Sequence, residues 1–188
     1  MPRSLDTVQT EYLVLTAQFG DVAAFAELLR RWLPIMRRHA ARLTADPTAT
    51  DDVVQEACLA LVSALKRLDD PSRAHGWMLR IVSNKAADWV RTRRRERVLT
   101  HSLPVRSPPD AHRDSPEARF EHTIQAAEIR AACLALPIHL RTIVSLFYGE
   151  HLPIPAIAAA LGSPAGTIKS RLHEARALIR QACERSPS

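Results

Sequence analysis

Apolar side chains recur along this chain with the spacing of helices. In residues 162–181, Ile168, Leu172, Ala175 and Ile179 lie on one face of a helix with 3.6 residues per turn. Similar stripes predict helices near 8–18, 21–44, 49–68, 74–96, 118–135, 138–148, 154–161 and 164–184. The alternation of apolar and polar positions that is typical of strands is missing. The pattern therefore predicts an all-α protein.

A proline-rich stretch separates these helices into two groups. Residues 98–117 contain four prolines, together with serines, aspartates and histidines, and few large apolar side chains. This composition is typical of a flexible linker. We therefore predict two small helical domains, over residues 8–97 and 118–185, joined by a linker over 98–117.

The end of the second group contains the outline of a helix-turn-helix. Gly162 suits the left-handed turn that ends a helix. Ser163 suits the N-cap and Pro164 the first position of the next helix. A short helix, a tight glycine turn and a second helix together predict a helix-turn-helix in the C-terminal domain.

The polar face of the second of these helices suits the major groove of DNA. Its candidate DNA-binding residues are Thr167, Lys169, Ser170, Arg171, His173, Glu174 and Arg176. Their hydroxyl, imidazole, ammonium and carboxylate groups can contact base edges, and their guanidinium groups can bind phosphates. A net charge of +6 also favours a polyanionic partner. A solvated basic helix is the other interpretation, but the glycine turn and the Ser-Pro start favour DNA binding.

An acidic face lies on the helix predicted over residues 49–68. Its outward residues are Asp51, Asp52, Gln55 and Glu56. Thr48 and Asp51 have the spacing of a capping box, and a helix dipole favours acids in its first turn. However, four acids and no base stand between Asp46 and Glu56, and such a patch could bind a basic protein surface. The residues alone leave both interpretations open.

A second polar line follows the helix predicted over residues 74–96. It consists of Trp77, Arg80, Asn84, Asp88 and Arg91. An asparagine can pair with a base edge, an exposed tryptophan can stack on an unpaired base, and arginines can bind phosphates. The other interpretation is a tryptophan in the core and an arginine-rich helix end that stabilises its own dipole. For Trp77 both remain open.

Taken in this order, the motifs resemble RNA polymerase sigma factors of the extracytoplasmic-function (ECF) class in the sigma-70 family. The sequence D-D-V-V-Q-E at 51–56 is similar to the family's E-D-x-V-Q-E signature. Residues 76–95 are similar to its W-L-x-x-I-A-x-N-x-x-x-D-x-x-R-R helix, and residues 136–180 to its C-terminal helix-turn-helix. The resemblance covers about residues 20–97 and 118–184.

The resemblance implies a division of labour between these surfaces. The acidic face would bind the clamp helices of the largest polymerase subunit. The polar line from Trp77 to Arg91 would recognise and melt the −10 promoter element, and the C-terminal helix would read the −35 element. Catalysis would belong to the polymerase, so no metal or cofactor is expected. Core RNA polymerase and promoter DNA are the implied partners, and many relatives are also held inactive by an anti-sigma factor.

Several positions depart from the family pattern, and among them the S-x-x-E cap of the family's helix-turn-helix is replaced by Pro153-Ile-Pro-Ala156. Cys58 stands where the family usually has an aromatic residue, and Val62 stands where a tryptophan is usual. We interpret both changes as substitutions inside the core. Glu174 occupies a position where a basic residue is common. A carboxylate there can accept from the amino group of cytosine, which predicts an unusual −35 sequence.

Two other classes of function explain less of the sequence. A stand-alone helix-turn-helix regulator would account for the C-terminal domain and the basic charge, but not for the acidic face. An enzyme is disfavoured because His101, His112 and His122 lack ligand spacing and no pairing of a nucleophile with a base stands out.

The remaining composition limits the chemistry and the cellular location. The three cysteines stand far apart, at 58, 133 and 183, so neither a disulfide framework nor a zinc knuckle is predicted. The first residues lack an apolar stretch of signal-peptide length, and no stretch reaches the ~20 apolar residues of a membrane span. We therefore expect a cytoplasmic protein.

Overall fold

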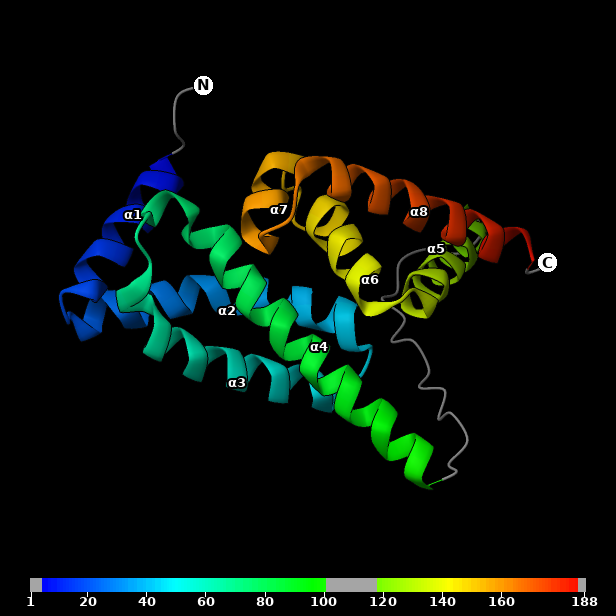
Figure 1. Ribbon diagram of the computed structural model, residues 1–188, viewed down its shortest axis with the longest axis horizontal. Coiled ribbons are helices and arrows are strands. Elements are labelled where there is room, and N and C mark those ends of the chain that lie inside the picture. Colours follow the sequence, from blue (N-terminus) through cyan, green and yellow to red (C-terminus); the bar gives the residue numbers. More distant parts are fainter. Residues whose placement is uncertain (1–4, 101–117, 186–188) are drawn as a thin grey trace.

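The computed structural model describes residues 5–100 and 118–185, and within these residues the secondary structure is helical without strands. The first group of helices is α1 (Leu5–Gln18), α2 (Val22–Thr44), α3 (Pro47–Ala64) and α4 (Ala74–Thr100) (Figure 1). Two 3₁₀ turns, η1 (Leu65–Arg67) and η2 (Pro71–Arg73), connect α3 to α4. The second group is α5 (Ala118–Ala135), α6 (Ile138–Val144), the π-helical turn η3 (Ser145–Gly149), α7 (Ile154–Leu161) and α8 (Ala165–Glu184). The all-α prediction is confirmed.

The boundary of the predicted linker differs from the structure at its start. Helix α4 continues to Thr100, so residues 98–100 are helical. Residues 101–117, which form the rest of the predicted linker, lie outside the described residues.

Aspartate side chains begin two helices of the first group. The Asp21 carboxylate accepts a hydrogen bond from the amide of Ala24 at 3.0 Å, at the start of α2. The Asp46 carboxylate accepts from the amide of Ala49 at 3.1 Å, at the start of α3. The predicted capping box of Thr48 and Asp51 is therefore wrong. Because α3 begins at Pro47, which needs no partner for an amide hydrogen, Asp46 is the N-cap.

In the turn of the helix-turn-helix, the predicted role of the glycine is confirmed, but the predicted start of the next helix is wrong. Gly162 ends α7 in the left-handed conformation, with φ of 61°, as predicted. The N-cap of α8 is Pro164, and no side chain caps this end, so the prediction that Ser163 caps and Pro164 starts the helix is wrong. The extended ψ of Pro164, 142°, keeps it outside the helix.

We expect Gly162→Ala to lower the free energy of unfolding by about 1 kcal/mol, because a Cβ disfavours the left-handed backbone. Chemical denaturation of the full chain measures this change. Gly166→Ala is the matched control, since Gly166 has an ordinary φ and an added methyl group would meet open space there. The control should keep or raise the stability, since alanine is the better helix former. Equal losses in both variants would contradict the backbone argument.

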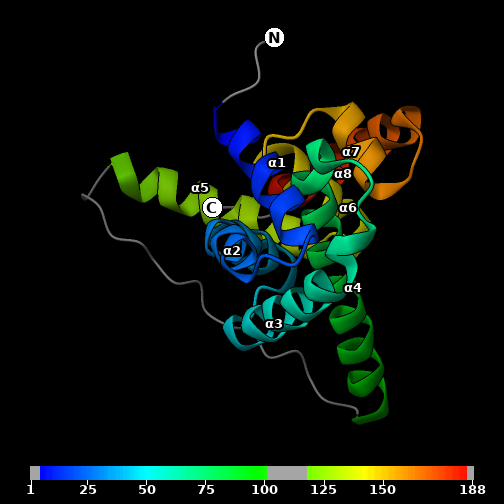
Figure 2. The same ribbon diagram turned by 90° about the vertical axis from the view of Figure 1, so that its left-hand side faces the viewer.

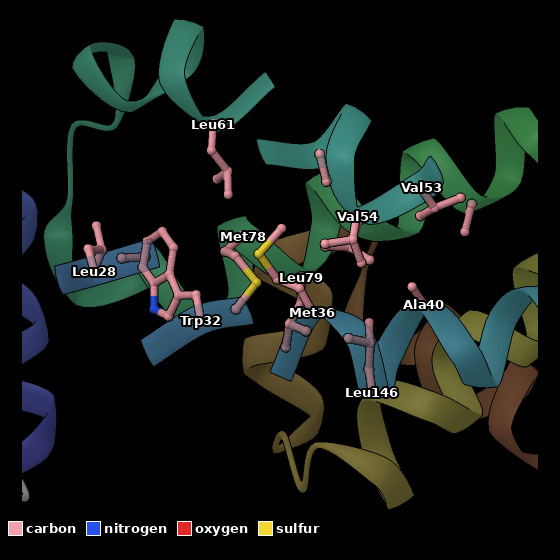
Figure 3. Close-up of a cluster of buried hydrophobic side chains, with 14 of the residues drawn as sticks. Leu28, Trp32, Met36, Ala40, Val53, Val54, Leu61, Met78, Leu79 and Leu146 are labelled. Carbon is pink, nitrogen blue, oxygen red and sulfur yellow. The ribbon is translucent and has the colours of Figure 1, made fainter. Parts of the chain in front are cut away.

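The main hydrophobic core lies between α2, α3 and α4. Leu28, Trp32 and Met36 of α2 meet Leu61 of α3 and Met78 of α4 (Figure 3). Side chains of the second group continue the same cluster: these are Ile143, Leu146, Ile157, Ile168 and Leu172. The two predicted domains are therefore packed together, with α7 lying against α4 (Figure 1).

Polar contacts join the two groups inside this interface. The His39 ring of α2 lies between two hydroxyl groups, with Nε2 2.8 Å from Ser83 Oγ and Nδ1 2.9 Å from Ser145 Oγ. Ser83 donates its hydroxyl hydrogen to the Leu79 carbonyl, so its oxygen accepts from His39 Nε2. The Nδ1 atom then accepts from Ser145. The neutral ring therefore makes one hydrogen bond with a hydroxyl of the first group of helices and one with a hydroxyl of the second group.

Two arginines make further contacts across the interface. The Arg42 guanidinium forms an ion pair with Glu150, whose side chain is buried. The Arg141 guanidinium donates to the Leu43 carbonyl at 2.7 Å, close to the end of α2. These bonds fix the second group on the C-terminal half of α2.

Candidate functional site

The acidic face predicted on α3 is exposed and partly neutralised. Asp51, Asp52, Gln55 and Glu56 all point to solvent. Asp51 pairs with Arg37 of α2 at 3.1 Å, and Glu56 pairs with Lys85 of α4 at 3.0 Å. Across the described parts of the chain, Asp52 and Gln55 have no side-chain hydrogen bond or ion pair. Exposed pairs contribute little stability, so these carboxylates can exchange their partners for those of a docking surface.

Two apolar side chains extend this face toward the C-terminal end of α3. Leu59 and Val62 are 60% and 58% exposed, and they follow Gln55 at helical spacing. The expectation that Val62 fills the core is therefore wrong for a geometric reason: Ala57 and Leu61 take the buried positions of this helix. Cys58 is half-buried against the core, and burial raises the pKa of its thiol. The Gln55–Leu59–Val62 spacing was the sequence signal for this extension.

The polar line on α4 is exposed beyond its first member. Trp77 is half-buried and packs against the main core. Arg80, Asn84, Asp88 and Arg91 are exposed, and Asp88 accepts a hydrogen bond from Arg91. The line therefore offers one amide and two guanidinium groups on one side of α4, with Arg91 oriented by its carboxylate partner.

The acidic face and the α4 line are adjacent. Lys85 lies one position after Asn84 on α4 and reaches Glu56 of α3. Helices α3 and α4 also pack against each other, crossing at an angle, with the end of α4 extending past α3 (Figures 1 and 2). A protein bound to the acidic face would therefore lie next to DNA bound along α4.

The helix α8 presents its predicted polar face to solvent. Lys169, Ser170, His173 and Glu174 are exposed, while Thr167 and Arg171 are half-buried. The Ser170 hydroxyl donates to the Gly166 carbonyl at 2.9 Å, so it remains available mainly as an acceptor. On the opposite side, Ile168, Leu172 and Ala175 are buried, which confirms the predicted apolar stripe.

Arg176 is held in place by an aromatic pair that the sequence did not single out. Its Nε donates to the Tyr148 hydroxyl at 2.7 Å. Its guanidinium carbon lies 5.7 Å from the Tyr148 ring centre and 5.9 Å from that of Phe147. These contacts orient the guanidinium and leave its other N–H groups for an anion. The pair of adjacent aromatic residues just before Gly149 was the available signal.

The two polar faces belong to helices that meet through α7. A Cβ added at Gly76, in the first turn of α4, would lie 3.4 Å from the Ala160 Cβ of α7. Helix α7 also packs against α8 as the first helix of the helix-turn-helix. We call this packing of the second group of helices on the first the closed arrangement. In it, the α4 line and the α8 face are held in a fixed position relative to each other.

Neither a metal centre nor a membrane span is found in the described part of the chain. Within residues 5–100 and 118–185, no group of three or more His, Cys, Asp or Glu side chains is arranged to hold a metal ion. No helix in these ranges has the length and apolar character needed to cross a membrane.

Comparison with known families and proteins gives matches along most of the chain. Residues 28–96 match the model of Sigma-70 region 2, and residues 126–179 match that of Sigma-70, region 4. The chain is 32% identical over 162 residues to the RNA polymerase sigma-E factor of Streptomyces coelicolor, covering 86% of this chain and 87% of that protein. It is 26% identical over 168 residues to the ECF RNA polymerase sigma factor SigW of Bacillus subtilis, covering 86% and 90%.

Solved structures support the same fold. The structure of CnrH in complex with the cytosolic domain of CnrY matches with a TM-score of 0.68 and 25% identity, covering 95% of this chain and 99% of that one. The sigma factor RpoE of Bartonella quintana, solved with the anti-sigma factor NepR, matches with a TM-score of 0.68 at 22% identity, covering 88% and 100%. The second likeness concerns the fold alone.

Proposed function

The chain belongs to the ECF class of the sigma-70 family of RNA polymerase sigma factors, and we propose that its three exposed faces make three separate contacts of promoter-specific initiation. It binds core RNA polymerase and directs transcription by recognising −10 and −35 promoter elements. In this proposal residues 8–97 bind the polymerase and the −10 element, residues 118–185 read the −35 element, and residues 98–117 connect them. The matches to both regions in one chain carry the proposal.

The acidic face is the proposed polymerase contact. Asp51, Asp52, Gln55 and Glu56 would bind the basic clamp helices of the largest subunit, with Asp52 and Gln55 as the members without internal partners among the described residues. Leu59 and Val62 would add apolar contact area at one end of this face. Charged residues steer such encounters, and the apolar positions limit dissociation.

The line on α4 is the proposed −10 contact. Asn84 would pair with the edge of an unstacked base, and Arg80 and Arg91 would bind the backbone on either side of it. Asp88 would orient Arg91 through the bond described above. Because Trp77 packs against the core, its role would be to support the edge of this surface rather than to stack freely on a base.

The face of α8 is the proposed −35 contact. Lys169, Ser170, His173 and Glu174 would reach base edges, and Thr167, Arg171 and Arg176 would bind phosphates. The aromatic pair under Arg176 supports this assignment, because it positions the guanidinium before DNA arrives.

Promoter binding requires the two groups of helices to separate. The −10 and −35 elements are about 25 base pairs apart, which corresponds to roughly 85 Å along B-DNA. The α4 line and the α8 face are linked by the direct packing of α7 on α4, so one closed body cannot span that distance. The closed arrangement is therefore the state before promoter engagement.

The proposal includes an inhibitory partner and a cellular location. CnrH was solved with the cytosolic domain of CnrY, and we propose that a partner protein, an anti-sigma factor, also binds this chain. The chain would act in the cytoplasm, where the polymerase supplies the chemistry of RNA synthesis. The sigma factor itself would act as a regulatory initiation factor.

Lys169→Ala tests the proposed −35 contact. We expect about a tenfold loss of transcription from the cognate promoter by the holoenzyme, because one base-edge or phosphate contact is removed. Binding to core polymerase should be unchanged. Run-off transcription and co-purification measure the two quantities on the same preparation.

Arg180→Ala is the matched control, since it removes a basic side chain from the same helix outside the proposed contact. It should leave both quantities close to wild type. An equal loss of transcription in the two variants would mean that the loss comes from the lower positive charge of α8 and not from a specific contact of Lys169. Sequence-specific promoter binding by the free wild-type chain, without any gain from core polymerase, would favour the stand-alone regulator.

A further inference from the structure

Helix α1 exposes an apolar stripe on the side that faces away from the core. Its members and exposed fractions are Leu5 89%, Val8 50%, Tyr12 64% and Leu15 45%, and Phe19, directly after the end of α1 at Gln18, continues the stripe at 92%. Single exposed apolar residues are ordinary, but a contiguous row of them marks an interaction surface. The helix lies at one edge of the molecule, with its outer side open (Figures 1 and 2).

The same helix is apolar on its inner face as well. Leu13, Val14 and Ala17 are buried against the neighbouring helices. A helix that is apolar on two opposite sides is expected to be covered on both. The outer stripe is exposed, so it has no such cover among the described residues.

The charges of α1 argue against a membrane as that partner. The helix carries Asp6 and Glu11 and no Lys or Arg. Helices that lie on anionic lipid surfaces carry basic residues along their polar side. A protein helix is the occupant that this composition fits.

We propose that the α1 stripe binds the same stripe of a second copy of this chain, in an antiparallel dimer. The stripe residues recur at intervals of three and four, which is the repeat by which two helices pack knobs into holes. An antiparallel pair centred on Tyr12 places Leu5 of one copy opposite Phe19 of the other. Val8 then lies at the level of Thr16, next to Leu15 of the partner stripe, and the surface is complementary to itself, as a two-fold interface requires.

The charges next to the stripe tolerate this pairing. In the antiparallel register Asp6 of one copy faces the region of Gln18 of the other, so like charges do not meet. Asp6 also lies 3.7 Å from Arg31 of its own chain. The other acid, Glu11, is half-buried on the inner side of the helix.

The area of the stripe is sufficient for a modest interface. From the exposed fractions, the five side chains present on the order of 700 Å² per copy, against roughly 800 Å² per partner in a standard-size interface. Such an interface predicts an association that depends on concentration, with a dissociation constant of about 1–100 µM. This inference does not depend on the proposed promoter contacts, because none of their residues belongs to α1.

Sedimentation velocity of the full chain over about 1–200 µM tests the dimer. Wild type should shift from the mass of a monomer to that of a dimer, and Tyr12→Glu should remain monomeric with at least about tenfold weaker association. Ile129→Glu, which adds the same charge at an exposed apolar position of α5, should dimerise like wild type. Thermal unfolding of each variant checks that the fold is kept.

Cysteine cross-linking tests the orientation. Tyr12→Cys should form a disulfide between copies above the wild-type background, because this position lies on the two-fold axis. Leu5→Cys should not, since the length of α1, about 21 Å, separates the two positions in an antiparallel pair. A monomer at all concentrations, equal dimerisation of Tyr12→Glu, or cross-linking through Leu5→Cys would each overturn the proposal. Binding of α1 to a different protein by a monomeric chain would also overturn it.

Discussion

Exchanging Asp52 and Glu56 for lysine is expected to abolish the co-purification of this chain with core RNA polymerase. Opposite charges across an interface become like charges, which costs several kcal/mol and corresponds to a loss of roughly 100-fold or more in affinity. Glu56→Lys also removes the 3.0 Å pair with Lys85 and places two ammonium groups side by side. Asp52 has no such pair among the described residues, so its exchange changes only the outward surface.

The effect on the fold should be small, which keeps the experiment interpretable. Both side chains are exposed, and exposed ion pairs stabilise by at most about 1 kcal/mol. Glu128→Lys with Glu184→Lys makes the same change of net charge on α5 and α8 and should bind core polymerase like wild type. Retained binding in the first double variant, or equal loss in the control, would remove the acidic face from the polymerase contact.

Leu59→Ala cannot replace the double charge reversal, because it changes the apolar contact area of the face and leaves its charge unchanged. The charge reversal distinguishes the two interpretations that the sequence left open for the acidic face. A role in capping α3 is already filled by Asp46, whose carboxylate binds the amide of Ala49. The other acids of the face do not cap α3, and Asp51 and Glu56 are held only by exposed ion pairs that an intermolecular contact can replace.

The elements of this fold were accessible from sequence because its helices are amphipathic over several turns. The predicted range 154–161 coincides with α7, and 118–135 coincides with α5. The predicted and observed helix ends differ where an α-helix changes to a 3₁₀ or π-helical turn. The predicted helix 49–68 ends at Ala64 and continues as a 3₁₀ turn, and the predicted helix 138–148 changes to a π-helical turn at Ser145. Periodicity does not distinguish these tighter or wider turns from an α-helix.

The candidate residues were predictable as faces of single helices, but their partners were not. The positions Asn84 and Lys169 followed from spacing within one helix. The support of Arg176 by Tyr148 depends on a contact across 28 positions of the chain. The pairing of Glu56 with Lys85 spans 29 positions. Contacts of this kind require the packing of α3 on α4 and of η3 beside α8, which no local pattern specifies.

The packing of the two groups on each other was also beyond the sequence. A proline-rich stretch predicts two domains, and it does not say whether their surfaces meet. In the structure, apolar residues of α7 continue the core under α4, and His39 joins Ser83 to Ser145. A buried histidine with hydroxyl partners has no sequence signature of its own, because an exposed histidine at the same position would read identically.

Acidification is expected to weaken the closed structure through His39, between about pH 6.5 and pH 5. Burial lowers the pKa of His39 from 6.5 to about 3, and the nearby positive charge of Arg42 and the ring of His75 contribute in the same direction. The unfolded chain therefore binds a proton below about pH 6.5 that the folded chain rejects. Stability is fully present above pH 6.5 and decreases as the pH falls toward 3.

The size of this effect follows from the pKa difference. The free energy of unfolding is about 2 kcal/mol smaller at about pH 5 than at neutral pH. Each pH unit between the two pKa values of His39 contributes about 1.4 kcal/mol to this decrease. His75 adds to it in the same direction, because burial lowers its pKa against the opposing effects of Glu150 and Asp6. Glu27, whose pKa is lowered to about 2 by Arg30 and Arg31, acts only below about pH 4.5 and lies outside this window.

Urea denaturation of wild type and His39→Gln at about pH 7.5 and pH 5 measures the contribution of this one ring. Glutamine can offer a donor and an acceptor to the two hydroxyl groups but does not titrate, so the variant should lose about 2 kcal/mol of the pH dependence. His173→Gln, at an exposed position of α8, should retain all of it. Unchanged pH dependence in His39→Gln would mean that another buried group carries the acid sensitivity of the closed state.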